Sequence, residues 1–296
     1  MEMWERMRLI LGVWLLSSAA ACAFNVYFEY REKHFHICDP AKAGSTSLSN
    51  TMYLAMSGGQ EYPLHCYTKN PGGYVMNFKC GWDKIPTFKV LLLSDHATFT
   101  PHPKRLPFVN YSMIIVRDPL HRIVSSWKSK IRPALCVSET DTKIDTDYQI
   151  GFLAKQGKNM TFVSFTQFVL NHLHLNEWKN AHWDPQIEIC GSPYHYQTRL
   201  KLEELNETAF NDLSLATGVT MKLEHLHSSA HESNKTRGFR ESNASYRPHD
   251  KLLDLTLDKI YNYYDDDYSY YGYIQNRTAD VAFLAKEFSQ FPEECF

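Results

Sequence analysis

The chain has 296 residues, of which 44% are hydrophobic, 22% charged and 14% aromatic. This composition is typical of a globular protein with an aromatic-rich core, and it excludes a mainly disordered, collagen-like or coiled-coil chain. The formal net charge of −2 excludes the basic field of a general nucleic-acid binder, so anion binding requires Lys and Arg placed locally.

An uncharged apolar segment lies at 9–28, behind Arg6 and Arg8. A helix of this length just crosses the core of a bilayer. Two interpretations are open: an uncleaved signal anchor with its N-terminus in the cytosol, or a signal peptide cleaved after the small residues 19–23. Both place the rest of the chain in the secretory pathway. The predicted cytoplasmic tail, signal segment, short stem and lumenal domain are 1–8, 9–28, 29–34 and 35–296.

Two further features agree with a lumenal chain. Six N-x-S/T sequons occur, at Asn110, Asn159, Asn206, Asn234, Asn243 and Asn276. Six cysteines follow the apolar segment, and an even number of cysteines in an oxidising compartment indicates disulfides. Among the possible pairings we favour Cys136 with Cys190, and Cys66 with Cys80.

Apolar runs and helical periodicity then alternate along the chain. Strands are predicted at 34–39, 89–94, 112–117 and 196–202. Helices are predicted at 47–56, 120–129, 162–175 and 252–264. Strands that alternate with helices predict an α/β domain with a central, mostly parallel sheet flanked by helices.

The first chemical motif follows the strand at 34–39. Its residues are Lys42, Ala43, Gly44, Ser45, Thr46 and Ser47. Small residues let backbone N–H groups surround an anion, the following helix N-terminus adds partial positive charge, and Lys42 adds a full one. The motif is not a Walker A loop, because its Lys precedes the small residues. A capped helix after an ordinary turn is the competing interpretation.

The second motif follows the strand at 112–117 and reads V-R-D-P-L-H-R-I-V-S. Arg117 stands where a parallel strand ends, which is where open α/β sheets bind ligands. Its guanidinium suits a phosphate, and the hydroxyl of Ser125 on the next helix can turn to the same anion. An ion pair between Arg117 and Asp118 that caps the helix is the competing interpretation.

Together these two motifs resemble the nucleotide signatures of sulfotransferases that use 3′-phosphoadenosine 5′-phosphosulfate. The resemblance implies that the first loop binds the 5′-phosphosulfate, and that Arg117 and Ser125 bind the 3′-phosphate. Three later segments resemble Golgi carbohydrate sulfotransferases of the chondroitin 4-O type: 181–185 followed by Cys190, then 201–205, and 267–273. The resemblance covers about residues 35–273 and implies a P-loop-like sulfotransferase fold.

The family further implies a metal-free sulfuryl transfer to a glycosaminoglycan-like glycan, most plausibly at position 4 of an N-acetylgalactosamine. A uronyl 2-O-sulfotransferase of heparan or dermatan is the nearest enzymatic alternative. The family also implies a Golgi membrane protein of single-pass type II topology, or a secreted protein if the signal is cleaved. The sequence departs from the family where Ala41 stands in place of the usual Pro before Lys42.

By its position between the two motifs, His96 resembles the catalytic base of related sulfotransferases, with Asp95 as the alternative base. An imidazole titrates in a range that suits a mildly acidic compartment. Lys42 is expected to stabilise the leaving phosphate. Arg237 and Arg240 lie in a basic loop that we expect to close over the cofactor, and His182 is expected to be structural.

Two other classes of function compete with a sulfotransferase. A lumenal kinase requires Mg²⁺ and a Walker Lys, and the Walker motif is absent from the sequence. A glycan-binding pseudoenzyme requires a degraded nucleotide site, yet Lys42, Arg117 and Ser125 are all present. The H-x-H pairs lack a nearby Cys or carboxylate at metal-binding spacing, so we predict no metal site.

Overall fold

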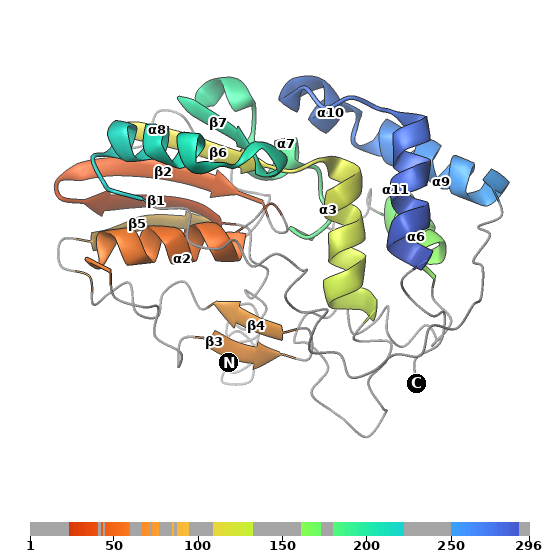
Figure 1. Ribbon diagram of the computed structural model, residues 1–296, viewed down its shortest axis with the longest axis horizontal. Helices are drawn as coiled ribbons and strands as arrows, with labels where there is room; N and C mark the ends of the chain where they lie inside the picture. The colour runs from red at the N-terminus through yellow and green to blue at the C-terminus, as the bar shows by residue number, and fades with distance from the viewer. Residues whose placement is uncertain are drawn as a thin grey trace, which may run out of the picture.

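The computed structural model describes residues 24–40, 43, 45–59, 67–70, 73–76, 85, 88–94, 109–132, 161–172, 180–221 and 250–289. A five-stranded sheet lies at its centre, in the order β5-β1-β2-β6-β7 (Figure 1). Its strands are β1 (Phe24–Tyr30), β2 (Lys33–Asp39), β5 (Phe88–Ser94), β6 (Tyr111–Val116) and β7 (Thr198–Lys201). A separate hairpin is formed by β3 (Tyr67–Asn70) and β4 (Gly73–Met76).

The central sheet is mostly parallel, as predicted. β6 pairs in parallel with both β2 and β7, whereas β1 is antiparallel to both of its neighbours, β2 and β5. Four strands therefore run in one direction and β1 alone runs in the other. β6 is buried along its whole length, which explains why its sequence is a continuous apolar run rather than an alternating one.

β1 corrects the predicted boundaries of the N-terminal segment. Residues 24–28, predicted as the end of the apolar segment, are strand residues, and Val26 and Phe28 are fully buried in the sheet. The predicted stem at 29–34 is instead the turn of the β1–β2 hairpin with the strand ends that flank it. Residues 1–23 lie outside the described part of the chain. Across the residues that are described, no helix has the length and apolar character needed to cross a membrane.

The turn of this hairpin consists of Arg31 and Glu32, both with positive φ, of 49° and 63°. Two successive left-handed residues match the right-handed twist of the flanking strands, although Asn and Gly are the usual residues in such a turn. The tight turn places β1 directly beside β2. The strand that precedes the predicted phosphate loop is thereby held in the interior of the sheet.

One face of the sheet is covered by α2 (Ser45–Met56) and α8 (Glu207–Thr217). Met52 of α2 and Phe210 of α8 are buried against Phe35 and Met113 of the strands. Burial of large side chains of this kind contributes about 1.5–3 kcal/mol each. This core fixes α2 against β2, and so fixes the turn between them.

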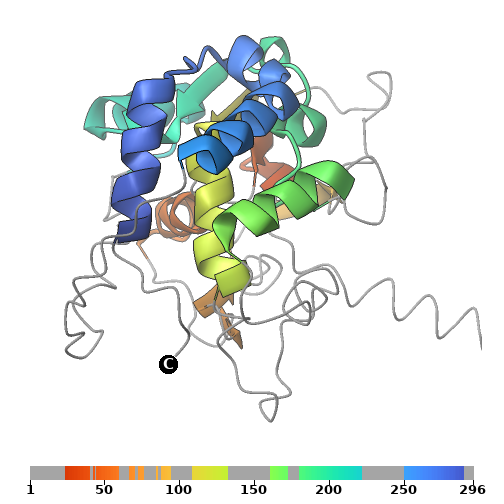
Figure 2. The same cartoon turned by 90° about the vertical axis from the view of Figure 1, so that its right-hand side faces the viewer.

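The remaining helices gather beyond one end of the strands (Figures 1 and 2). They pack into a second aromatic-rich core that includes Trp127, Phe165, Trp183 and Tyr264. The elements concerned are α3 (Pro119–Ser126), which continues into the π-helical turn Trp127–Ile131, α6 (Phe162–His172), α9 (Asp250–Tyr263), α10 (Asp265–Tyr271) and α11 (Arg277–Ser289). The short α7 (Gln186–Cys190) and α10 pack on the second face of the sheet.

The predicted strands and helices are confirmed to within a few residues at each end, with the helix predicted at 120–129 divided between α3 and the π-helical turn. α7, α8, α10, α11, β1 and the β3–β4 hairpin were not predicted. Single-turn 3₁₀ helices at Pro193–His195 and Leu202–Glu204 flank β7, so β7 is shorter than the predicted strand.

Candidate functional site

The end of β2 leads directly into the N-terminus of α2. Pro40 closes a turn, because its carbonyl accepts a hydrogen bond of 2.9 Å from the backbone N–H of the buried Ala43. Ser45, Thr46 and Ser47 are the first three residues of α2, and its first turn carries no acidic residue. The first N–H groups of a helix have no partner within the helix, so this end of α2 is suited to an anion.

The end of β6 leads in the same way into α3. Asp118 is the N-cap of α3, and its carboxylate accepts a hydrogen bond of 3.0 Å from the backbone N–H of His121. Pro119 occupies the first helical turn, where its missing N–H has no cost. Ser125 lies one turn beyond His121, on the same side of α3 and partly exposed. Arg117 precedes the cap and is partly exposed.

The sheet brings these two turns together. β2 and β6 are adjacent and parallel, with Cys38 opposite Ile114. The turn that begins at Pro40 and the turn that begins at Arg117 therefore leave neighbouring strands at the same edge of the sheet. This part of the molecule therefore carries backbone N–H groups at the start of α2, the guanidinium of Arg117 and the hydroxyl of Ser125, which are donor types that bind anionic groups.

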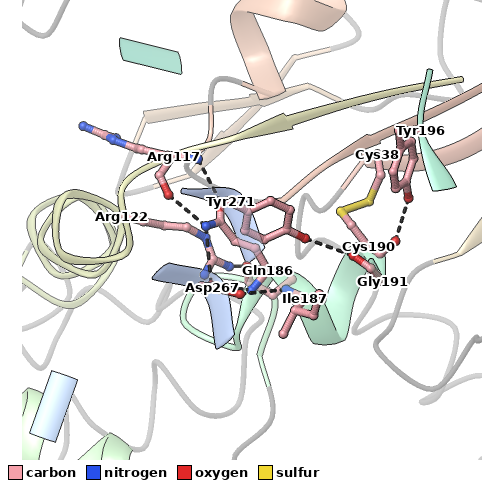
Figure 3. Close-up of a disulfide and its surroundings, with 11 residues drawn as sticks. Cys38, Arg117, Arg122, Gln186, Ile187, Cys190, Gly191, Tyr196, Asp267 and Tyr271 are labelled. Carbon is pink, nitrogen blue, oxygen red and sulfur yellow. Dashed lines mark hydrogen bonds between the residues drawn. A yellow bond between two sulfur atoms is a disulfide. The ribbon is translucent and has the colours of Figure 1, made fainter. Parts of the chain in front are cut away.

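Gln186 holds the backbone at Arg117 and was not identified from the sequence. Its side-chain Oε1 accepts a hydrogen bond of 2.9 Å from the Arg117 N–H, and its Nε2 donates one of 2.8 Å to the Arg117 carbonyl (Figure 3). Gln186 is fully buried at the start of α7. The sequence signal was its position directly after the H-W-D-P segment.

Asp267 of α10 holds α7 in turn. Its carboxylate accepts hydrogen bonds of 2.7 Å from the Gln186 N–H and 2.8 Å from the Ile187 N–H. Burial raises the pKa of Asp267 to about 6, against the opposing effect of these hydrogen bonds and of the Arg122 charge. The segment at 267–273, singled out by its resemblance, therefore begins with a residue that caps the helix after H-W-D-P.

The segment at 201–205 also reaches the end of β6. One oxygen of Glu203 accepts a hydrogen bond of 3.1 Å from the Asp118 N–H, and the other accepts one of 3.1 Å from the Tyr273 hydroxyl. Lys201 lies 4.7 Å from the centre of the Tyr273 ring. Burial lowers the pKa of Arg117, while Glu203 and Asp118 act in the opposite direction and favour its charged form. The end of β6 therefore places the Arg117 guanidinium near two carboxylates that favour its charged form.

Arg122 has a structural position although it belongs to the same motif as Arg117. It is 1% exposed, and its guanidinium donates hydrogen bonds of 2.6 Å to the carbonyls of both Asp184 and Ala181. These contacts hold the H-W-D-P segment, in which His182 is also buried with Nδ1 2.7 Å from the side-chain oxygen of Asn180. His182 has the structural position expected for it.

Asp39 ends β2 and is fully buried. Within the described part of the chain, neither of its carboxylate oxygens has a hydrogen-bond partner. Burial raises its pKa well above the ordinary range of an Asp, while the charge of Arg122 opposes that shift.

The structure contains a disulfide between Cys38 and Cys190, with a Cα–Cα distance of 5.7 Å. The predicted pairing of Cys136 with Cys190 is therefore wrong, because Cys190 is bonded to the end of β2. No local pattern indicates this pairing, since the two cysteines are 152 residues apart and meet only when α7 packs on the sheet. Cys66, Cys80 and Cys136 lie outside the described residues.

Several predicted site residues cannot be placed, because they lie outside the described part of the chain: Lys42, Gly44, His96, Arg237 and Arg240. Of the predicted site, the structure positions Ala43, the start of α2, Arg117 and Ser125. Among the residues that it describes, no group of three His, Cys, Asp or Glu side chains is arranged to hold a metal ion.

The comparison with known proteins agrees with this arrangement. The family model described as the sulfotransferase family matches residues 27–274, which is most of the chain. The match begins within β1 and ends before α11, so it includes all five strands of the sheet and both predicted phosphate-binding turns. No curated protein and no solved structure matches the chain. The chain belongs to the sulfotransferase family.

Proposed function

We propose that this member of the sulfotransferase family transfers a sulfuryl group from 3′-phosphoadenosine 5′-phosphosulfate to a sugar hydroxyl of a glycan. The observation that carries the proposal is the pairing of β2 with β6. Because of this pairing, the N-terminus of α2, which has no acidic residue in its first turn, lies at the same edge of the sheet as Arg117. A sulfuryl donor with two separated anionic ends requires two such positive sites.

The donor's two ends fit different residues. Backbone N–H groups at the start of α2, together with Lys42, would bind the 5′-phosphosulfate. Arg117 and Ser125 would bind the 3′-phosphate, and the basic loop with Arg237 and Arg240 would close over the nucleotide. When bound, the nucleotide supplies an activated sulfuryl group, and the charge of Lys42 favours the departure of the phosphate.

The acceptor is proposed to be a glycosaminoglycan-like chain, with position 4 of N-acetylgalactosamine as the first candidate and a uronyl 2-hydroxyl as the second. His96 is proposed to take the proton of the attacking hydroxyl, because it follows β5, the strand two places from β2 in the sheet. Its place in the chain and the family resemblance support this role. A glycan-binding protein without activity is the remaining alternative.

The sequons and the N-terminal apolar segment support a lumenal location, and the family resemblance supports the Golgi. The disulfide adds support, because structural disulfides form in oxidising compartments. We propose a Golgi protein that is anchored by its N-terminal segment or released after signal cleavage.

Calorimetric titration of the full chain with 3′-phosphoadenosine 5′-phosphate, without metal, tests the donor assignment. We expect micromolar binding that Arg117→Ala weakens by about 10²-fold or more, because a charge-assisted bidentate contact to phosphate is lost. Arg199→Ala is the matched control. Arg199 is exposed on β7 and lies over the Tyr194 ring, at 5.0 Å, so its loss should leave the affinity unchanged.

Labelled donor and desulfated chondroitin, dermatan and heparan then identify the acceptor. Sulfuryl transfer to chondroitin by the wild type supports the 4-O assignment. Loss of this transfer in His96→Ala, with nucleotide binding retained, supports His96 as the base. Transfer only to heparan or dermatan favours the 2-O alternative. A folded wild-type chain that binds glycan but not nucleotide contradicts the enzyme and favours the glycan-binding alternative.

A further inference from the structure

α7 touches both strands from which the proposed donor site is built. At its N-terminal end, the side chain of Gln186 bonds to the backbone of Arg117 at the end of β6. At its C-terminal end, Cys190 is bonded to Cys38 near the end of β2, two residues before Pro40. Figure 3 shows both attachments on this one short helix.

At the end of β6, the hydrogen bonds with Gln186 take the place of hydrogen bonds to a neighbouring strand. The ladder between β6 and β7 ends at the pair Val116 and Lys201, and β2 pairs with β6 only as far as Ile114. Beyond these pairs the N–H and C=O of Arg117 would have no strand beside them. The amide of Gln186 carries an acceptor oxygen and a donor NH₂ group, and it satisfies both groups of this single residue.

α7, which carries Gln186, is held by hydrogen bonds at both of its ends. Asp267 accepts hydrogen bonds from the backbone N–H groups of Gln186 and Ile187, and its Oδ2 lies 3.4 Å from the Gln186 Nε2. The carbonyls of Cys190 and Gly191, at the other end of α7, accept hydrogen bonds from the hydroxyls of Tyr196, at 2.6 Å, and Tyr271, at 3.0 Å. Buried polar groups satisfied to this degree rigidify their surroundings.

We infer that α7 sets the position of Arg117 relative to the turn after β2, and that Gln186 is a positioning residue for recognition of the 3′-phosphate. This inference rests on the proposed function. Gln186 does not touch the nucleotide in this arrangement. Gln186 holds the backbone from which the Arg117 side chain extends. Replacement of Gln186 should therefore weaken only the contribution that Arg117 makes to the affinity for the nucleotide.

The test measures how much the 3′-phosphate contributes to affinity. The full chain is titrated with 3′-phosphoadenosine 5′-phosphate and with adenosine 5′-monophosphate, and the ratio of the two Kd values is compared between variants. We expect Gln186→Met to reduce the preference for the 3′-phosphate by roughly tenfold, with little change in Kd for the monophosphate. In an Arg117→Ala background, Gln186→Met should cause no further loss of this preference, because coupled residues are non-additive.

Gln197→Met is the matched control. Gln197 accepts a hydrogen bond of 2.8 Å from the Ser112 N–H at the opposite end of β6, so the same substitution removes the same kind of bond far from Arg117. It should leave the ratio unchanged. If Gln186→Met does not fold, Gln186→Asn keeps a neutral amide but is one methylene too short to bond to both the N–H and the C=O of Arg117, and a loss in the same ratio is expected.

The outcomes separate the two proposals. A Gln186 variant that folds and keeps the full preference, or that weakens both nucleotides equally, overturns the positioning role while the proposed function stands. Losses from Gln186→Met and Arg117→Ala that simply add also overturn it. A wild-type chain that binds neither nucleotide overturns the proposed function and this inference with it.

Discussion

At the scale of single residues, buried polar side chains determine the geometry of the site. Gln186, Asp267 and Arg122 are each buried, and each makes two or more hydrogen bonds to backbone groups. A buried polar group that loses its partner costs about 1–3 kcal/mol, and a buried charge costs more. These residues therefore keep the ends of the strands and the H-W-D-P segment in one arrangement.

Asp267 makes the stability of the chain dependent on pH. Its pKa is raised from 3.8 to about 6 by burial, so the folded state holds a proton at a pH where the unfolded chain has released it. This carboxyl's contribution to the free energy of unfolding is therefore largest at low pH and falls as the pH rises toward 6. The shift corresponds to about 3 kcal/mol across that range.

Comparison with Asp267→Asn isolates this effect. Denaturant unfolding of both chains should show that the stability of the wild type, relative to the variant, falls from about pH 4 to about pH 6 and is level above about pH 7. At neutral pH the comparison sets two effects against each other, because the amide of the variant loses one of the two hydrogen bonds to backbone N–H groups but also removes a buried charge. A relative stability that rises over the acidic range would show that those hydrogen bonds outweigh burial.

At the scale of elements, the sequence predicts best where the local signal is unambiguous. β6 is a continuous apolar run followed by Asp-Pro, and its strand, its helix and Arg117 were predicted together. β1 was missed because a strand buried on both faces, with Val26 on one and Tyr27 on the other, resembles the end of an apolar signal segment. Gln186 was missed because its partner is 69 residues away along the chain.

α8 and α11 each carry a capping signal in the sequence at their N-terminus. Both begin at an Asn that accepts a hydrogen bond from the N–H three residues later, at 3.0 Å for Asn206 and 3.1 Å for Asn276. α8 also ends at Gly218, whose φ of 69° is the left-handed value common at helix ends. Both asparagines are also exposed sequons, so one residue type serves as a cap and as a glycan acceptor.

The double role predicts that a glycan can be attached at Asn276 without loss of the cap. A glycan is attached to the amide nitrogen, while the cap uses the oxygen Oδ1. In secretory expression we expect Asn276→Asp and Thr278→Ala each to remove one N-glycan, detected by mass spectrometry of the peptide. Both variants keep the capping oxygen, so neither should lower Tm through the cap.

Asn276→Ala is the contrasting variant. It removes the glycan and the cap together, and it should destabilise the chain by about 1 kcal/mol relative to Thr278→Ala. An unmodified Asn276 in the wild-type chain would contradict the prediction that this sequon carries a glycan. Equal stability of the Ala and Thr278 variants would show that the cap contributes nothing.

At the scale of the molecule, the fold joins two cores at the edge of the sheet where the proposed donor site lies. One core packs α2 and α8 on the sheet, and the other packs the helices beyond the ends of the strands. α7 and the disulfide lie between them, in the smaller cluster that includes Cys38, Ile114 and Tyr271. The relative position of the two proposed phosphate-binding turns therefore depends on contacts between distant parts of the chain.

The disulfide is a long-range covalent contact and should be a large contributor to stability. It joins residues separated by 152 positions, and the chain-entropy estimate for a loop of this size is about 5 kcal/mol. A chain with Cys38→Ser and Cys190→Ser together should therefore show a clearly lower Tm and denaturant midpoint than the wild type. Cys38→Ser alone should be at least as destabilised, because it leaves Cys190 free to mispair.

Reduction provides the control within one experiment. A reducing agent should lower the Tm of the wild type toward that of the double variant, because the same cross-link is lost in both. Any smaller shift that reduction causes in the double variant measures the contribution of the remaining cysteines. A wild type that is no more stable than the double variant would show that the link from β2 to α7 contributes nothing to folding. α7 would then be held by its hydrogen bonds to Asp267, Tyr196, Tyr271 and the backbone of Arg117, and the position of Arg117 would depend on those bonds.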